Sequence, residues 1–205
     1  MKPLVILVAG GTASGKSTVV KEILEKSGLD DVIIIRHDDY YKNFNNLPFC
    51  EREKINYDHP NSLDNELLIS HLKQLLANET IKKPIYDFVN HLRSEKKEEI
   101  IPKKIIIIEG ILILEDPKIR EFGDILIFVE CDDDLRFIRR MLRDMNERGR
   151  SLQSIVNQYT KTVKPMHHKF VSPSKRFADI IILNDNKHDV AVDLIVAKIE
   201  NLLKG

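Results

Sequence analysis

The sequence has few cysteines, no long apolar run and no net charge, and these features argue against three classes of protein. Its 205 residues include only two cysteines, Cys50 and Cys131, far apart and without metal-ligand spacing, so we expect free thiols in a reducing compartment. No apolar run is long enough for a signal-peptide core or a membrane span, which predicts a cytoplasmic protein with no membrane partner. The 32 Lys and Arg residues balance the 32 Asp and Glu residues, and this zero net charge argues against a general nucleic-acid binder.

What the sequence does contain is an alternation of short apolar runs with helical periodicity. Buried-strand candidates occupy positions 4–8, 32–35, 105–108, 125–129 and 178–183. Apolar residues recur at helical spacing along residues 63–76, where Ser62 is the expected N-cap, and along residues 192–203. The order predicts a parallel α/β sheet of about five strands with helices on both sides, in one domain spanning residues 1–205.

A glycine-rich loop follows the first apolar run. It fits the pattern G-x-x-x-x-G-K-[ST] of a phosphate-binding loop, and it lies between a predicted strand and a predicted helix, as that loop requires. Glycines let backbone amides point at phosphate oxygens, and the lysine and serine reach the phosphates and Mg²⁺. The nucleotide-binding candidates are Gly10, Gly11, Thr12, Ala13, Ser14, Gly15, Lys16, Ser17 and Thr18. The fold class is therefore α/β of the P-loop NTPase type.

Acidic residues follow two of the other predicted strands. Ligands of open parallel sheets collect at the carboxyl ends of the strands. Asp38, which precedes Asp39, Tyr40 and Tyr41, is therefore a candidate for chemistry, although helix capping and aromatic packing explain these residues equally well. Glu109 ends the third run, where an acid beside a P-loop usually serves Mg²⁺ together with the loop serine.

A hairpin and an arginine-rich helix are predicted near the carboxyl ends of the strands. Residues 81–102 read as a β-hairpin, in which Tyr86, Phe88 and His91 would lie on one face; that face either packs on the core or stacks on a base. The helix after residues 125–129 carries Leu135, Ile138, Leu142 and Met145 on its apolar side, with its arginines mainly elsewhere. Its arginines either form a solvated face or belong to a lid, over about residues 143–165, that neutralises phosphate charge. The next helix should run from Ser151 to just before Pro165.

One motif competes with this interpretation. Residues 186–189 match N-K-x-D, the guanine-reading motif of GTPases, but Glu109 and Gly110 stand where a GTPase needs D-x-x-G. A signalling GTPase is therefore disfavoured. A contact between this loop and the donor base, which would affect the choice between ATP and GTP, stays open.

Over nearly its whole length the chain resembles the uridine kinase (uridine–cytidine kinase) family of P-loop kinases. The phosphate loop indicates only that a nucleotide binds. The more specific elements, in this order, are Asp38-Asp39-Tyr40-Tyr41, Asn56-Tyr57-Asp58-His59-Pro60, Pro84-Ile85-Tyr86-Asp87-Phe88, Glu109-Gly110-Ile111-Leu112 and Arg143 through Gly149-Arg150. The resemblance implies transfer of the γ-phosphoryl of ATP or GTP to the 5′-hydroxyl of uridine or cytidine with Mg²⁺, by a protein that is commonly tetrameric.

The resemblance also implies roles for the acceptor-side residues. Asp38 would be the base that faces the 5′-hydroxyl. Asp58 would hold the ribose hydroxyls with help from Arg140, and Arg150 and Gln158 would make further nucleoside contacts.

The pyrimidine would be bound by aromatic and polar side chains. Tyr86 and His91 would read its edge, and Phe88 and Tyr41 would lie on its two faces.

On the donor side, the resemblance makes Lys16 and Arg143 catalytic residues and places Arg148 on the phosphates. Ser17, Glu109 and Asp38 would serve Mg²⁺.

Two departures and two alternatives remain. Residues 183–186 read Leu-Asn-Asp-Asn, where the family usually has Pro-Arg-Gly-Gly, and Met166-His167-His168 replaces more apolar residues. The first change leaves the preference between ATP and GTP open. A P-loop kinase for another small alcohol, such as a sugar phosphate, and a non-catalytic nucleotide-dependent regulator are the alternative functions.

Overall fold

The centre of the molecule is a five-stranded parallel sheet. The computed structural model describes residues 2–185 and 188–204. The strands lie in the order β2 (Val32–Arg36), β5 (Ile105–Glu109), β1 (Leu4–Gly10), β6 (Ile125–Glu130) and β7 (Ile180–Leu183). All five predicted strands occur, with ends that differ by no more than two residues, so the predicted fold class is confirmed.

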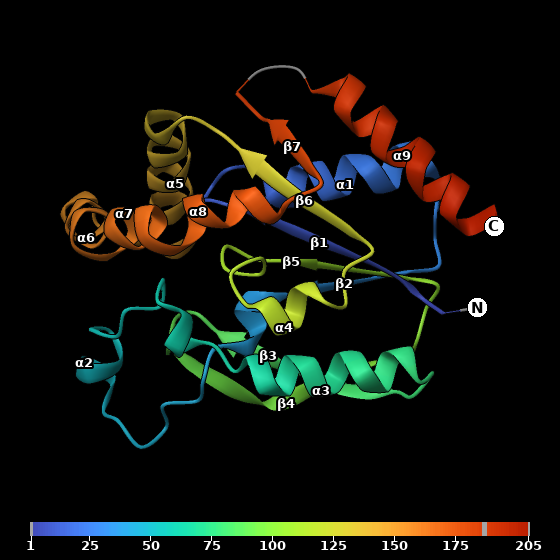
Figure 1. Ribbon diagram of the computed structural model, residues 1–205. Coiled ribbons are helices and arrows are strands. Elements are labelled where there is room, and N and C mark those ends of the chain that lie inside the picture. Colours follow the sequence, from blue (N-terminus) through green and yellow to red (C-terminus); the bar gives the residue numbers. More distant parts are fainter. Residues whose placement is uncertain (1, 186–187, 205) are drawn as a thin grey trace.

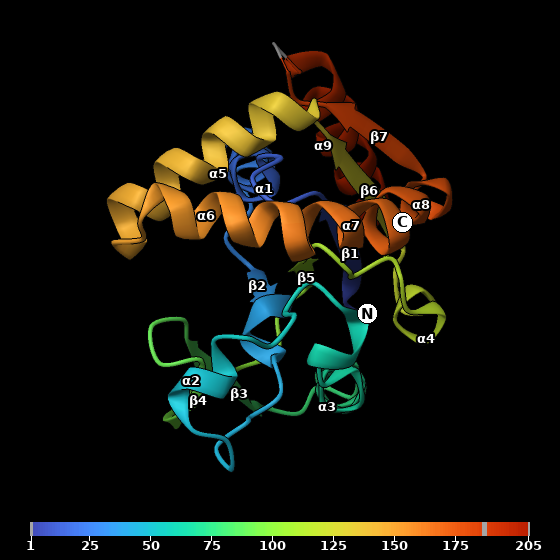
Figure 2. The same cartoon turned by 90° about the vertical axis from the view of Figure 1, so that its left-hand side faces the viewer.

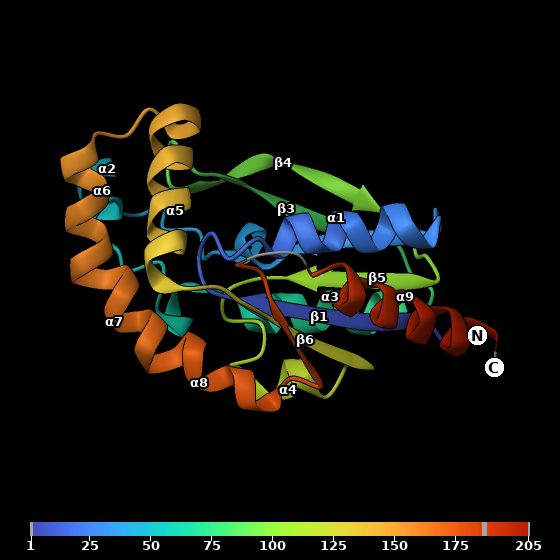
Figure 3. The ribbon, with the colours of Figure 1, turned by 90° about the horizontal axis from the view of Figure 1, so that it is seen from above.

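Helices cover both faces of this sheet (Figures 1 and 3). α1 (Lys16–Ser27) and α9 (Asp189–Lys204) pack on one face, and α3 (Asn65–Leu76) and α4 (Pro117–Arg120) lie on the other. The alternating residues of β1 divide between the two cores, with Ile6 packing toward α1 and α9 and Leu7 toward α3. A strand buried on both faces must be apolar throughout, as β1 is.

The predicted hairpin forms a second, antiparallel sheet. β3 (Ile81–Asp87) pairs with β4 (Leu92–Ile100), and a single helical turn, α2 (Phe49–Arg52), lies near its tip. One capping prediction was wrong: Asp64, rather than Ser62, caps α3 by accepting a hydrogen bond from the Leu67 amide. Ser62 is buried and donates to the carbonyls of Tyr57 and His59, so it fixes the preceding loop.

The apolar side of the helix α5 (Asp133–Arg148) faces outward. Ile138, Leu142 and Met145 are 46%, 52% and 43% exposed, whereas Arg136, Arg140 and Asp144 are buried. The apolar stripe of a helix usually faces the core. Instead the charged stripe faces the carboxyl edge of the sheet, because the phosphate loop and the polar side chains of other elements lie there.

The chain after α5 forms one long helical stretch that crosses the carboxyl edge of the sheet (Figure 2). It comprises α6 (Leu152–Gln158), α7 (Lys164–Met166) and α8 (Ser172–Ser174), joined by π-helical turns at Tyr159–Val163 and His167–Val171. The predicted end before Pro165 was therefore wrong. Each π turn precedes a proline, Pro165 or Pro173, and its wider winding accommodates a residue that lacks an amide hydrogen.

Two further predictions concern thiols and membranes. Cys50 and Cys131 are both free, the first exposed and the second buried. Among residues 2–185 and 188–204, no helix has the length and apolar composition that crossing a membrane requires.

Candidate active site

The phosphate loop leaves the carboxyl end of β1, the central strand. Gly10 and Gly15 have φ values of 149° and 89°, which favour glycine, and Gly15 stands directly before α1. The Lys16 ammonium donates to the carbonyl oxygens of Gly10 and Gly11 at 3.1 Å each. Burial lowers the pKa of Lys16, while nearby Glu109 and Asp38 oppose that shift. A cation and a helix amino terminus thus meet at one point, as phosphate binding requires.

The other members of the predicted loop differ in exposure. Ser14 is fully buried, Thr12 and Ala13 are partly buried, and Thr18 is exposed on the first turn of α1. Ala13 also has a positive φ, 56°, which helps the loop turn back on itself.

A serine–carboxylate pair lies beside the loop. Ser17 Oγ donates to the two carboxylate oxygens of Glu109 at 2.9 and 2.8 Å. The pair forms because β5 is hydrogen-bonded to β1, with Glu109 in register with Val8. A hydroxyl and a carboxylate are the oxygen ligands that Mg²⁺ prefers, so these residues fit that ion. No group of three His, Cys, Asp or Glu side chains suited to a metal occurs within the described part of the chain.

Asp38 lies in the 3₁₀ turn His37–Tyr40 that follows β2. Its charge influences the pKa values of Lys16, Tyr41 and Asp58, so it stands among the phosphate loop, the aromatic residues and a second carboxylate. The structure therefore brings Asp38 to the same edge as Glu109, as strand order and the strand-end rule predict.

Five rings gather beside Asp38. Tyr86 contacts Tyr41 and Phe88, each with ring centroids 5.2 Å apart, and His91 stacks on Tyr57 at 5.2 Å with an interplanar angle of 16°. The hydroxyl groups of Tyr57 and Tyr86 are buried close to each other, but neither makes a well-formed hydrogen bond among the described residues. Burial lowers the pKa of His91, which favours its neutral ring. The cluster offers flat apolar faces together with uncharged polar atoms.

Asp58 connects this cluster to the arginines. It is 8% exposed, and burial raises its pKa. The charge of Arg140 opposes this shift, whereas the charges of Asp38 and Asp144 add to it. Arg140 in turn donates to Thr12 Oγ1 at 2.7 Å and to Gln158 Oε1 at 2.9 Å. One guanidinium thus links the phosphate loop, α6 and the neighbourhood of Asp58.

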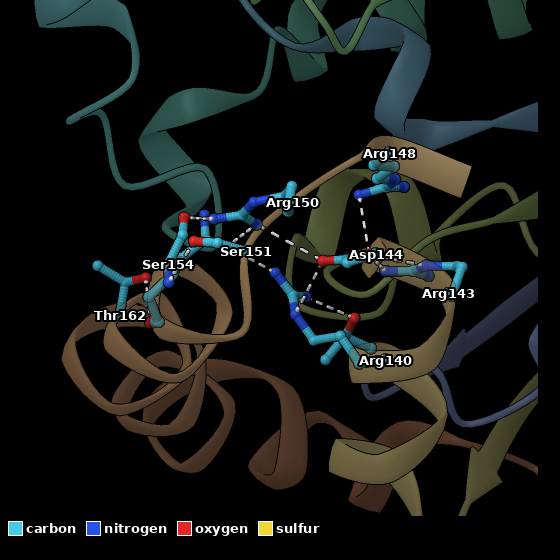
Figure 4. A network of polar contacts seen from close by, with 10 residues as sticks. Arg140, Arg143, Asp144, Arg148, Arg150, Ser151, Ser154 and Thr162 are labelled. Carbon is cyan, nitrogen blue, oxygen red and sulfur yellow. Dashed lines mark hydrogen bonds and ion pairs between the residues drawn. The ribbon is translucent and has the colours of Figure 1, made fainter. Parts of the chain in front are cut away.

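The remaining predicted arginines surround the buried carboxylate of Asp144 (Figure 4). Arg143 binds Asp144 Oδ1 through Nε at 3.0 Å and Nη2 at 2.8 Å. Arg150 donates to Gln158 Oε1 at 2.5 Å and to Ser154 Oγ at 3.0 Å. The guanidinium of Arg148 lies 5.2 Å from the ring centre of Phe88, so it joins α5 to the hairpin.

Known proteins of one family are similar to this chain over nearly its whole length. The model of the phosphoribulokinase / uridine kinase family matches residues 5–191. The chain belongs to this family. It is 54% identical to the uridine kinase of Clostridium perfringens over 202 residues, which are 98% of this chain and 97% of the relative. It is 51% identical to the uridine kinase of Ligilactobacillus salivarius over 203 residues, 99% of this chain and 95% of the relative. These matches show that the protein is a kinase of the P-loop superfamily.

Solved structures agree on the fold of the family. D-glycerate 3-kinase from Cryptococcus neoformans matches with a TM-score of 0.64 at 17% identity, over 89% of this chain and 86% of the other. Phosphoribulokinase from Rhodobacter spheroides matches with a TM-score of 0.67 at 13% identity, over 89% of this chain and 70% of the other. At such identities the likeness concerns the fold alone.

Several residues at the site were not among those predicted from the sequence. Arg136 is 2% exposed, and a side chain at Gly11 would lie 2.5 Å from its Nη1 atom. Arg136, Arg140 and Asp144 recur every four residues, so this spacing could have indicated a buried polar stripe. Tyr57 belongs to the motif at residues 56–60, in which only Asp58 was predicted to have a role.

Asn184 is a second omission, in the loop that departs from the family pattern. Its amide donates to the Ser14 carbonyl at 2.7 Å, and a side chain at Gly15 would lie 2.0 Å from Nδ2. Asn184 directly follows β7, so the strand-end rule would have found it. Of the N-K-x-D stretch, residues 186 and 187 lie outside the described residues, whereas Asp189 lies 3.6 Å from Lys26 of α1.

Proposed function

We propose that this protein is a pyrimidine nucleoside kinase of the cytoplasm. It transfers the γ-phosphoryl of ATP or GTP, with Mg²⁺, to the 5′-hydroxyl of uridine or cytidine and so yields UMP or CMP in pyrimidine salvage. The observation that carries the proposal is the meeting of the phosphate loop with Asp38, Asp58 and the aromatic cluster at one edge of the sheet. The names of the two bacterial relatives point to the same acceptor.

On the donor side, the phosphate loop wraps the phosphates with its amides, and Thr18 continues it into α1. Lys16 exchanges its carbonyl partners for phosphate oxygens, because charged acceptors form stronger hydrogen bonds. Ser17 and Glu109, with Asp38 beside them, hold Mg²⁺, which supplies neutralisation of phosphate charge. Arg143 and Arg148 approach from a lid formed by about residues 143–165.

On the acceptor side, Asp58 accepts hydrogen bonds from both ribose hydroxyls, since a carboxylate has two acceptor oxygens. Arg140 orients this group from its position between Thr12 and Gln158. Arg150 shares Gln158 and completes the polar wall on this side.

The pyrimidine lies among the rings. Tyr86 and His91 read its edge, and the faces of Tyr41 and Phe88 bound the slot. The Tyr86 hydroxyl, buried beside that of Tyr57, and the uncharged imidazole suit the neutral carbonyl and amide edge of a pyrimidine. Asp38 accepts the proton of the 5′-hydroxyl as that oxygen attacks the phosphorus.

We also propose a homo-oligomer, with four copies by family resemblance. The outer stripe of α5, formed by Ile138, Leu142 and Met145, is apolar and exposed. A second copy would remove this stripe from water, which is favourable. Light scattering on the purified protein tests this directly.

The function is tested by a panel of acceptors in an assay that couples ADP or GDP release to NADH oxidation. Uridine and cytidine are expected to stimulate release, whereas thymidine, adenosine and a pentose phosphate are not. Stimulation by the pentose phosphate alone would make the protein a sugar-phosphate kinase. Slow hydrolysis that no acceptor changes would favour a regulator.

A further inference from the structure

A carboxylate with no assigned role occupies the centre of the arginine cluster. Asp144 is completely buried. Besides the two hydrogen bonds from Arg143, its Oδ1 lies 3.6 Å from Arg148 Nη1. Its Oδ2 lies 3.6 Å from Arg140 Nε and 3.5 Å from Arg150 Nη1 (Figure 4). Four guanidinium groups therefore converge on one carboxylate.

These arginines fall into two groups by their other partners. Arg140 and Arg150 both donate to Gln158 Oε1, so they are fixed without Asp144. Arg143 and Arg148 have no carboxylate other than Asp144 within reach among the described residues. The two arginines that the proposed function places on the donor phosphates are thus the two whose ion pairs, within the described part of the chain, are with Asp144, although Arg148 also lies over the ring of Phe88.

We propose that Asp144 is the positioning residue of the donor-binding arginines. It holds Arg143 near Lys16 of the phosphate loop, and Arg148 between α5 and the hairpin, before the donor binds, and it yields these guanidinium groups in part to the phosphates during transfer. This inference rests on the proposed donor side of the function and adds a residue to it.

The balance of charge supports an exchange of partners. One carboxylate faces four guanidinium groups and has only about four acceptor positions, so it cannot give each guanidinium two good hydrogen bonds. The contacts of Arg148 and Arg140, at 3.6 Å, exceed a normal hydrogen-bond length. Burial and the charge of Arg143 lower the pKa of Arg148, as expected where positive charge is incompletely neutralised. A triphosphate would supply the missing negative charge.

The backbone of Asp144 also takes part in the turn between α5 and α6. Its carbonyl accepts hydrogen bonds from the amides of Gly149 and Arg150, the latter at 3.1 Å, and Gly149 has a φ of 61°. An Asp144→Asn substitution keeps these backbone bonds and the side-chain shape while removing the charge. It therefore separates the electrostatic role from the role in the turn.

The test compares wild type, Asp144→Asn and Asp134→Asn, a matched change at an exposed position of the same helix. Binding of tripolyphosphate is measured by calorimetry, and kcat by the coupled assay. Because the variant removes the anion that competes for Arg143 and Arg148, we expect tripolyphosphate to bind about 3- to 10-fold more tightly. Because the arginines are no longer positioned, kcat is expected to fall about tenfold or more. Asp134→Asn should change neither.

Unchanged or weaker tripolyphosphate binding by Asp144→Asn, or an unchanged kcat, would overturn the proposal and leave Asp144 a structural ion pair. The binding measurement needs no acceptor, so it stands even if uridine proves not to be the substrate. If the variant does not fold, wild type provides the test through the ¹⁵N resonances of arginine Nε. Tripolyphosphate should shift the resonances of Arg143 and Arg148 more than those of Arg140 and Arg150, and equal or absent shifts would refute the exchange.

Discussion

Replacing Asp58 by asparagine should raise the KM for uridine and leave the thermal stability of the protein nearly unchanged. The asparagine side chain would keep one acceptor oxygen but present an amide to the second ribose hydroxyl, so one charge-assisted hydrogen bond is lost. Such a bond is worth about 1.5–3 kcal/mol, which corresponds to an increase in the KM for uridine of about 10- to 100-fold. The value of kcat should fall less, because Asp58 binds the ribose rather than the reacting atoms.

The stability of the same variant follows from the pKa of Asp58. Burial raises this pKa despite the opposing charge of Arg140, so the charged form is disfavoured in the folded protein. Such a group contributes stability below the unfolded-state pKa, and that contribution is lost as the pH rises through the folded-state pKa. At pH 7.5 removal of the charge should therefore leave Tm within about 2 °C of wild type, or raise it.

The assay measures initial rates against uridine at saturating Mg·ATP, with calorimetric melting in parallel. Asp193→Asn, on the exposed side of α9, is the control and should change neither quantity appreciably. An unchanged KM would remove Asp58 from the ribose site. A large fall in Tm together with the higher KM would mean that the carboxylate is chiefly structural.

Three further predictions concern other parts of the site. Glu109→Gln should raise the Mg²⁺ concentration needed for half-maximal rate by about 10- to 100-fold, because it weakens the ligand set around Ser17; an unchanged Mg²⁺ titration would contradict this. Asn184→Ala should raise the KM for Mg·ATP about fivefold and leave that for uridine unchanged, since it removes the hydrogen bond to the Ser14 carbonyl; equal effects on both substrates would argue for general loosening. Burial lowers the pKa of His167 from 6.5 to about 4, so its contribution to stability is present above pH 6.5 and lost as the pH falls toward 4. His167→Leu should therefore reduce the loss of unfolding free energy at acid pH, measured by urea denaturation, by about 3 kcal/mol at the most acid pH. The matched change at exposed His168, His168→Leu, should not.

The sheet and the phosphate loop were predictable because their signals are local. Runs such as residues 105–108 can be read as buried strands without further knowledge, and the strand-end rule then places Asp38 and Glu109 at one edge. The periodicity of α5 was also correct, but periodicity does not say which stripe faces inward. Its charged stripe is buried because the phosphate loop and Gln158 provide partners, a fact that only tertiary structure reveals.

Long-range partners explain the other differences between prediction and structure. Pro165 normally ends a helix, yet the π turns on either side of it let the helix continue across the sheet. Asn184 and Arg136 meet the phosphate loop from segments more than 100 residues away. The strand-end rule and the four-residue spacing in α5 could therefore mark them as candidates, but could not show that they contact this loop. The sequence predicted that the hairpin rings gather, and they do, whereas the contribution of Tyr57 depends on how its loop folds over His91.

The central claim, that Asp38 activates an acceptor hydroxyl at the phosphate loop, is tested most directly by Asp38→Asn. Single-turnover transfer of the γ-phosphoryl of ATP to uridine is measured alongside the calorimetric Kd of uridine. We predict a transfer rate reduced by about 10²- to 10⁴-fold with a uridine Kd within about threefold of wild type. A transfer rate close to wild type would contradict the assignment of Asp38 as the base.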